Sequence, residues 1–220
     1  MPILEIDSVQ FEIGNQRILS DIYLRCETGK ITGILGRNGA GKSCLMQIIF
    51  GSLKANKSIR IDSEALIPKL LTPNKIAYLP QFNIIPQNLS IKGAFTHFNQ
   101  EFSVFANQFI EFKDRENTRI GSLSGGARRL IELYLLLKSK GPFILLDEPF
   151  THLSPVQIEK VMELIIQEKK NKGIIITDHL YKYILELSDS LYILKEGKTY
   201  WIKDRIDLEK HGYLNPLIKD

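Results

Sequence analysis

The chain has 220 residues, of which 44% are hydrophobic and 25% charged, and its formal net charge is +4. This length suits one large domain, and the composition is that of an ordinary globular protein rather than a disordered or fibrous one. The positive charge is weaker than the basic stripe typical of nucleic-acid-binding proteins, so no nucleic-acid partner is expected. The densest basic group, Lys169, Lys170 and Lys172, is interpreted as a solvated helix end, with a footprint for lipid headgroups or nucleic acid as the alternative.

The two cysteines, Cys26 and Cys44, provide no disulfide framework and favour a reducing compartment. The first residues lack the basic and apolar pattern of a signal peptide. The longest uncharged apolar runs, such as 173–177, are far shorter than the roughly 20 residues of a membrane helix. We therefore expect a cytoplasmic protein that acts on any membrane from its aqueous side.

Strands and helices are expected to alternate along most of the chain. Apolar periodicity, Gly51 as a helix C-cap and the capping box Ser154-Pro155-Val156-Gln157 define most of them. In chain order they are strands 9–13 and 22–26 around the turn 14–15, strand 30–35, helix 42–50, strands 58–62 and 75–79, a mostly helical stretch 90–139, strand 143–146, helix 154–172, strand 174–177, helix 180–187, the hairpin 191–194 and 199–202, and helix 204–212. This order predicts an α/β core with one helical insertion.

A glycine-rich loop between a strand and a helix fits the pattern G-x-x-x-x-G-K-S. Its glycines let backbone N–H groups surround a phosphate at a helix N-terminus, while Lys42 can reach the β- and γ-phosphates and Ser43 can ligate Mg²⁺. A plain glycine turn is the alternative. The residues expected to hold the nucleotide here are Gly36, Arg37, Asn38, Gly39, Ala40, Gly41, Lys42, Ser43 and Cys44.

Two acidic residues follow the buried strand at 143–146. Asp147 at the strand tip can hold the Mg²⁺ shell, and Glu148 can polarise an attacking water. Adjacent acids after an apolar strand are common, so this interpretation depends on the phosphate loop that precedes them.

A second helix start suited to an anion lies at Leu123-Ser124-Gly125-Gly126. Ser124 is a natural N-cap, and the two glycines expose backbone N–H groups. A single phosphate loop does not need this feature, and a well-capped helix is the alternative.

Together these motifs resemble the ATP-binding cassette (ABC) ATPases over nearly the whole chain. The phosphate loop corresponds to Walker A, Gln81 in Tyr78-Leu79-Pro80-Gln81 to the Q-loop, Leu123 to Gly126 to the signature, Asp147-Glu148-Pro149 to Walker B, and His179 in Ile176-Thr177-Asp178-His179 to the switch histidine. The resemblance implies an α/β P-loop NTPase (RecA-like) core at about 1–82 and 140–220, with an antiparallel β subdomain and an inserted α-helical subdomain at about 83–139.

The resemblance also implies roles, with ATP and Mg²⁺ as cofactors. Two subunits, alike or paralogous, would dimerise head to tail, so that Ser124, Gly125 and Gly126 of one cap the ATP held by Walker A of the other. The implied catalytic residues are Glu148, His179, Gln81 and Lys42, and the implied Mg²⁺ residues are Ser43, Gln81 and Asp147. Taken alone, Gln81 could be a surface residue and His179 a helix cap, and His97, His152 and His211 are interpreted as surface or packing residues.

Three positions depart from the family pattern. Ala127 replaces the usual Gln after the signature, which we expect to be tolerated. Ser154 caps a helix but lacks the carboxylate that ends the D-loop, which leaves open how the two sites communicate. Ile13 stands at the position of the adenine-stacking aromatic. Phe11 on the same strand face is a candidate substitute; without one, ATP binding would weaken by about 1 kcal/mol. Active hydrolysis is still predicted.

Six phenylalanines recur at spacings of three and four between the Q-loop and the signature, which predicts an apolar helical seam split near Ser103. They are interpreted as the core of the helical lobe, or alternatively as partly lining a groove for a coupling helix of the transmembrane partner. They are Phe95, Phe98, Phe102, Phe105, Phe109 and Phe112.

The leading functional hypothesis is an ATP-hydrolysing transporter subunit that drives a separate transmembrane permease from the inner face of the membrane. The alternative is a soluble ABC ATPase of DNA repair or translation. Only 81 residues separate Lys42 from Ser124, too few for the long coiled coil of repair proteins, and the chain holds one cassette rather than two. Intact Glu148 and His179 argue against a non-hydrolysing regulator. The tripeptide 177–179 resembles that of ATPases serving lipopolysaccharide export and branched-chain amino-acid uptake.

Overall fold

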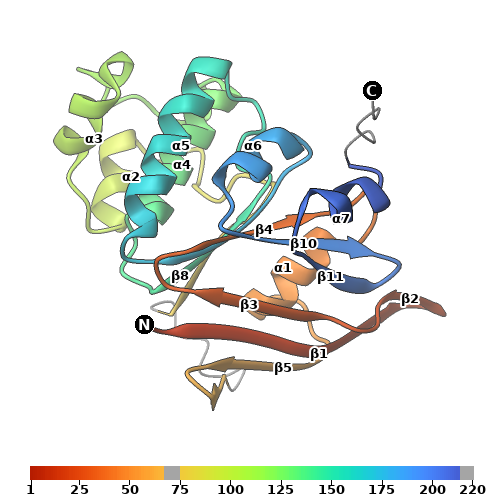
Figure 1. The fold of residues 1–220 in the computed structure, drawn as a ribbon. Helices are drawn as coiled ribbons and strands as arrows, with labels where there is room; N and C mark the ends of the chain where they lie inside the picture. Colours follow the sequence, from red (N-terminus) through yellow and green to blue (C-terminus); the bar gives the residue numbers. More distant parts are fainter. Residues whose placement is uncertain (67–74, 214–220) are drawn as a thin grey trace, which may run out of the picture.

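The computed structural model describes residues 1–66 and 75–213, which form two sheets and an outlying group of helices (Figure 1). Two short 3-10 helices, Ile110–Phe112 and Ile120–Ser122, precede α4. The other elements are β1 (Ile3–Ile13), β2 (Gln16–Leu19), β3 (Tyr23–Glu27), β4 (Ile31–Leu35), α1 (Lys42–Phe50), β5 (Asn56–Ile61), β6 (Glu64–Ala65), β7 (Ile76–Leu79), α2 (Ile91–His97), α3 (Phe102–Gln108), α4 (Gly125–Leu137), β8 (Phe143–Asp147), α5 (Pro155–Lys169), β9 (Gly173–Thr177), α6 (Tyr181–Leu187), β10 (Ser190–Lys195), β11 (Lys198–Ile202) and α7 (Arg205–Lys210).

The central sheet has the strand order β11-β10-β4-β9-β8-β7, in which only the edge strand β11 pairs antiparallel. Strands β4, β8 and β9 are buried on both faces, as expected of a covered parallel sheet. The second sheet is antiparallel, in the order β2-β1-β5-β6 with β3 also paired to β1. These sheets confirm the predicted α/β P-loop core with an antiparallel β subdomain.

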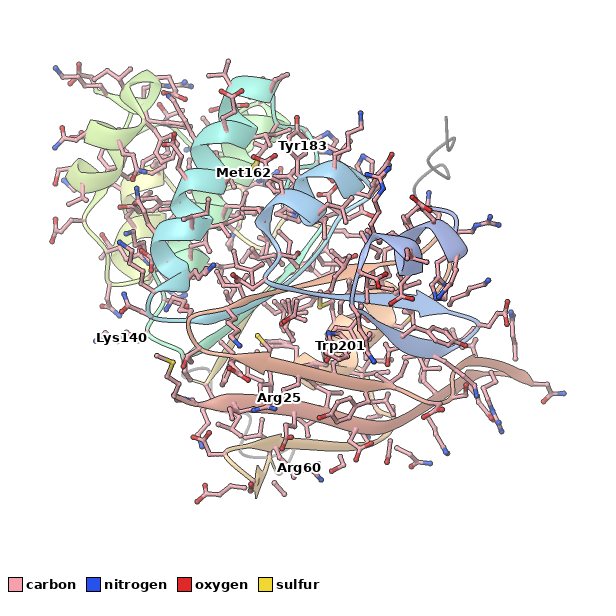
Figure 2. All side chains as sticks on the ribbon, in the orientation of Figure 1. Arg25, Arg60, Lys140, Met162, Tyr183 and Trp201 are labelled. Atoms are coloured by element: carbon pink, nitrogen blue, oxygen red, sulfur yellow. The ribbon has the colours of Figure 1, made fainter. Side chains whose placement is uncertain are left out.

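Two hydrophobic clusters hold the layers together. One cluster joins α1 to the antiparallel sheet and to one face of the central sheet, and α1 lies between the two sheets (Figure 1). The other cluster joins the opposite face of the central sheet to α4, α5, α6 and the helical lobe. Met162 and Tyr183 lie on this helical side, whereas Arg25 and Arg60 lie on the antiparallel sheet (Figure 2).

The predicted pairing of strands 9–13 and 22–26 around the turn 14–15 is wrong. That turn joins β1 to β2, a short strand that the periodicity did not indicate. Strand β3 instead pairs with the first half of β1, where Ile3 lies opposite Glu27 and Asp7 lies opposite Tyr23. One long strand thus serves both partners, because β3 pairs with residues 3–7 of β1 and β2 with residues 11–13, where a register shift falls between Phe11 and Glu12. The short strand β6 was also not predicted.

The helix boundaries were largely predicted from their caps. Gly41 and Gly51 flank α1 with positive φ values of 100° and 92°, and Ser154 with Gln157 forms the predicted capping box of α5. Helix α5 ends at Lys169 rather than Lys172.

The basic group at the end of α5 is not a uniformly solvated helix end. Lys172 is buried, and its Nζ donates hydrogen bonds to the carbonyl oxygens of Ser139 and Gly141. Lys169 is paired with Asp189 at 2.6 Å. These two lysines therefore serve the fold, which leaves little support for a binding footprint.

The phenylalanines between α2 and α4 mainly form the core of the lobe. Phe95, Phe105, Phe109 and Phe112 are buried, and Phe105 packs against the other three and against Tyr134 at centroid distances of 4.9–5.0 Å. The predicted split falls just before Phe102, because α2 ends at His97 and α3 begins at Phe102. The interpretation as lobe core is thus supported for four of the six rings.

Candidate active site

The site forms where parallel strands end. Strands β4, β9, β8 and β7 are neighbours, with Asp147 opposite Thr177 and Leu79 opposite Leu146. The loops that follow these four strands therefore meet at one edge of the sheet, the usual place for a ligand in an open α/β fold. They carry the phosphate loop, Gln81, Glu148 and His179.

The phosphate loop is tightly folded around Lys42. Its ammonium donates to the carbonyl oxygens of Gly36 at 2.8 Å and Arg37 at 3.2 Å. A Cβ at Gly36 would lie only 2.8 Å from the Leu194 carbonyl oxygen, so glycine is required there. Burial lowers the pKa of Lys42, and the nearby carboxylates of Glu148, Asp147 and Asp178 oppose this shift. The loop thus presents a buried cation at the N-terminus of α1.

Ser43, Gln81 and Asp147 converge from three separate elements. Ser43 Oγ donates to Asp147 Oδ1 at 3.2 Å, and Gln81 Nε2 donates to Ser43 Oγ at 2.8 Å. The Tyr78 hydroxyl donates to Asp147 Oδ2 at 3.3 Å. Asp147 is 1% exposed, and this burial raises its pKa despite the hydrogen bonds that lower it. A neighbouring cation would stabilise the ionised form of a carboxylate that is buried to this extent.

The donor set of this cluster fits Mg²⁺. A hydroxyl, a carboxylate and an amide oxygen are hard ligands, and a flip of the Gln81 amide would turn its oxygen toward Ser43. No group of three or more His, Cys, Asp or Glu residues suited to a metal occurs within 1–66 and 75–213. Magnesium typically takes one or two carboxylates and completes its shell with water and substrate phosphate oxygens, so the single carboxylate of Asp147 is compatible with this ion.

Glu148 and His179 face each other beside this cluster. His179 Nδ1 lies 3.8 Å from Glu148 Oε2 and 3.2 Å from Asp178 Oδ1. Glu148 adopts a positive φ of 50°, uncommon for a non-glycine residue, and its N–H donates to the Thr177 carbonyl oxygen at 2.8 Å. Asp178, which sequence reasoning did not single out, accepts hydrogen bonds from the N–H groups of Phe150 and Leu180. Asp178 thereby connects the loop after β8 to the loop after β9.

The glycine-rich start of α4 is capped and exposed. Ser124 caps the helix by accepting a hydrogen bond from Ala127 N–H, and both Ser124 and Gly125 are exposed. A Cβ at Gly126 would lie 2.5 Å from the His152 carbonyl oxygen, so the signature packs against the loop after Walker B. His152, interpreted from the sequence as a surface or packing residue, is exposed, has a positive φ of 66°, and lies next to Gly125 and Gly126.

Two buried charged residues on α4 connect the motifs, and no pattern in the sequence indicated them. Arg129 donates to the carbonyl oxygens of Pro80, Asp147 and Glu148 at 2.6–2.9 Å. Glu132, fully buried, accepts from the N–H groups of Ile84 and Ile85. Helix α4 therefore holds both the Q-loop and Walker B backbones.

Residues 19–151 match the family model described as "ABC transporter". The chain belongs to this family. It is 31% identical to the lipopolysaccharide export system ATP-binding protein LptB of Escherichia coli K12, covering 83% of this chain and 82% of the relative. It is 29% identical to the high-affinity branched-chain amino acid transport ATP-binding protein BraG of Pseudomonas aeruginosa, with 89% and 90% coverage.

Solved structures support the same fold. An ATP-binding subunit of an ABC transporter superposes with a TM-score of 0.82 at 21% identity, covering 95% of this chain and 92% of the other. A bacterial Atm1-family exporter with ATP bound gives a TM-score of 0.83 at 19% identity, where this chain covers 40% of the longer protein.

This ABC family member is the ATP-binding and ATP-hydrolysing subunit of a transporter, as its motifs predicted. The alternative of a soluble repair or translation ATPase is not favoured, because the relatives are ATP-binding subunits of importers and exporters. Within the described parts of the chain, no helix combines the length and hydropathy needed to cross a bilayer.

Proposed function

We propose that two copies of this subunit, or one copy and a paralogue, close head to tail around two Mg²⁺-ATP and drive a separate transmembrane permease from the inner face of the membrane. The core at about 1–82 and 140–220 would bind nucleotide, and the lobe at about 83–139 would transmit the movement. The observation that carries the proposal is the convergence of Ser43, Gln81 and Asp147 beside the Glu148–His179 pair.

The reaction is attack of water on the γ-phosphorus, with ADP as the leaving group. Glu148 would accept the proton of the attacking water. His179, whose Nδ1 lies 3.2 Å from Asp178 Oδ1, would contact the γ-phosphate, and Lys42 would neutralise the charge on its oxygens. Ser43, Gln81 and Asp147 would hold the Mg²⁺, which would neutralise negative charge on the phosphate oxygens.

The head-to-tail arrangement is supported by the exposure of the signature. Ser124 and Gly125 stand exposed at the capped N-terminus of α4, a helix of 13 residues. Neither residue lines the cavity beside the phosphate loop of their own chain. A helix start of this kind attracts an anion. The triphosphate bound by a second subunit is the anion that the family relationship suggests.

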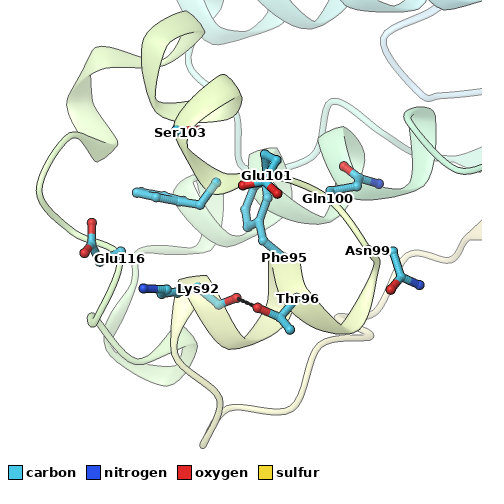
Figure 3. A pocket seen from close by; sticks show the side chains of 9 residues that line it. Lys92, Phe95, Thr96, Asn99, Gln100, Glu101, Ser103 and Glu116 are labelled. Atoms are coloured by element: carbon cyan, nitrogen blue, oxygen red, sulfur yellow. Dashed lines mark hydrogen bonds between the residues drawn. The ribbon is translucent and has the colours of Figure 1, made fainter.

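Docking of the permease is supported at the boundary between core and lobe. A groove of about 630 Å³ there includes Phe50 and Tyr78 from the core and Phe98 from the lobe. The hollow between α2 and α3, of about 560 Å³, is by contrast bordered mostly by polar residues such as Lys92, Thr96 and Glu116 (Figure 3). The boundary groove therefore suits an apolar coupling helix better.

Replacement Glu148→Gln tests the catalytic assignment. The amide cannot accept the proton of the attacking water, so phosphate release should fall by at least about 100-fold, as expected for loss of a general base. ATP binding should persist, and light scattering should detect an ATP-dependent dimer that the wild type forms only transiently.

The exposed Glu163→Gln on α5 provides a matched control that should leave hydrolysis unchanged. Unchanged phosphate release by Glu148→Gln would refute the catalytic assignment. An ATP-loaded variant that stays monomeric would refute the head-to-tail arrangement. Co-purification of the intact subunit with a protein that has membrane-spanning helices tests the permease.

A further inference from the structure

Strand β1 does not supply an aromatic ring to the cavity beside the phosphate loop. Ile13 stands where the stacking aromatic was expected; it is 59% exposed and does not line this cavity. Phe11, the candidate substitute, packs on the core around α1 and borders a different hollow with Lys54 and Asn56. The base of a bound nucleotide would therefore find no stacking partner on this strand.

The cavity itself has four walls and a volume of about 600 Å³, within the range of small-molecule sites. The four walls are formed by β2 with Ile18, by the phosphate loop at 37–40, by the β10–β11 turn, and by the segment after α7. Ile18 also lies against Gly41, where a Cβ would meet its side chain at 3.0 Å. The cavity is thus continuous with the phosphate-binding loop.

Among the described residues that line the cavity, the aromatic side chains are His211 and Tyr213. We propose that Tyr213 stacks on the purine base of ATP and so replaces the aromatic residue missing from β1. This inference rests on the proposed nucleotide site and assigns the group that recognises the base.

Short-range contacts hold Tyr213 in place. Its N–H donates to the Leu208 carbonyl oxygen at 2.9 Å, and Gly212 makes the turn with a φ of 77°. Leu208 is buried, which fixes α7 to the main core. The Tyr213 ring meets Tyr181 edge-on at a centroid distance of 6.2 Å and stays partly exposed.

The chemistry of the surroundings suits a base and its ribose. Burial raises the pKa of Tyr213 and nearby Arg37 opposes the shift, so the ring is neutral at physiological pH and lies near the phosphate loop. His211 Nδ1 is buried without a hydrogen-bond partner among the described residues. A ribose hydroxyl or base nitrogen in the cavity could supply one.

The test compares two probes, Mg²⁺-ATP and Mg²⁺ with inorganic tripolyphosphate, which has the phosphates but no base. Tyr213→Ala should weaken ATP binding about 5- to 150-fold, as for loss of one aromatic–base stack, while tripolyphosphate affinity stays unchanged. Tyr213→Phe should bind ATP as the wild type does. In steady-state hydrolysis, Tyr213→Ala should raise KM and leave kcat unchanged, because stacking stabilises ground and transition states alike.

Tyr23→Ala on β3, 47% exposed, is the matched control and should change neither affinity. The chain has one tryptophan, so the double variant Trp201→Phe, Tyr213→Trp carries a single reporter. ATP should quench its fluorescence and tripolyphosphate should not.

Parallel loss of both affinities in Tyr213→Ala would show that Tyr213 only supports the fold and would overturn the inference. ATP affinity equal to that of the wild type would overturn it as well. A wild-type protein that binds neither probe would instead contradict the proposed nucleotide site itself.

Discussion

The guanidinium of Arg129 on the signature helix donates a hydrogen bond to the carbonyl oxygen of Asp147 at 2.8 Å. The same side chain reaches Pro80 just before Gln81, and Glu148 just after Asp147. One buried arginine thus connects the signature helix, the Q-loop and Walker B. Its burial lowers its pKa, and Glu132 and Asp147 oppose that shift. A link of this kind would suit the proposed transmission of movement from the core to the lobe.

Replacement Arg129→Met should lower the free energy of unfolding by about 3–5 kcal/mol, the range for removing one member of a buried charge pair. Three carbonyl oxygens lose their donor, and Glu132 loses its neighbouring charge. Chemical denaturation measures the change. Arg205→Met is the control, because its exposed pair with Glu209 contributes about 0–1 kcal/mol. Equal losses in the two variants would contradict the linking role.

Replacement Asp147→Asn should stabilise the nucleotide-free protein at neutral pH and abolish hydrolysis. Burial raises the pKa of Asp147, so the folded state holds this proton more tightly than the unfolded state does. The wild type therefore loses stability as the pH rises from about 4 through the folded-state pKa, whereas asparagine does not titrate.

The gain in stability of Asp147→Asn over the wild type should accordingly be absent below about pH 4 and grow toward neutral pH. Thermal unfolding in a pH series measures it. Saturating Mg²⁺-ATP should reverse the order, because the wild type alone gains the bound cation. A variant that is less stable than the wild type at pH 7 without nucleotide would argue against a destabilising carboxylate.

The two signature glycines should respond differently to alanine. Gly126→Ala should cost about 1–3 kcal/mol of stability, since its Cβ would lie 2.5 Å from the His152 carbonyl oxygen. Gly125→Ala meets only ordinary contacts at 3.5 Å or more, so its stability should be kept or slightly raised. Its ATPase activity should nevertheless fall, because the added methyl group stands where the partner's nucleotide would approach. Full activity in Gly125→Ala would speak against capping in trans.

Truncations in the phenylalanine set should separate lobe core from docking surface. Phe105→Ala should cost about 3–5 kcal/mol, because the ring is fully buried among the other three buried phenylalanines and Tyr134. Phe98→Ala, in the boundary groove, should leave the subunit folded but reduce its co-purification with the permease. Thermal melting and pull-down measure the two effects. Loss of folding in both variants would leave no docking role for Phe98.

The sequence alone determined the features that depend on neighbours a few residues apart. The phosphate loop with its glycines, the capping box at Ser154 and the acids after β8 are local patterns, and each lies where its pattern predicted. Their order along the chain was enough to indicate the family and the ATPase activity.

Only the tertiary structure decided which distant residues meet. It paired β1 with β3 instead of forming the expected hairpin, turned Arg129 and Glu132 inward, and brought Tyr213 and Ile18 to the same cavity. Strand register and side-chain proximity across more than a hundred residues depend on how whole layers pack, and no local periodicity encodes that.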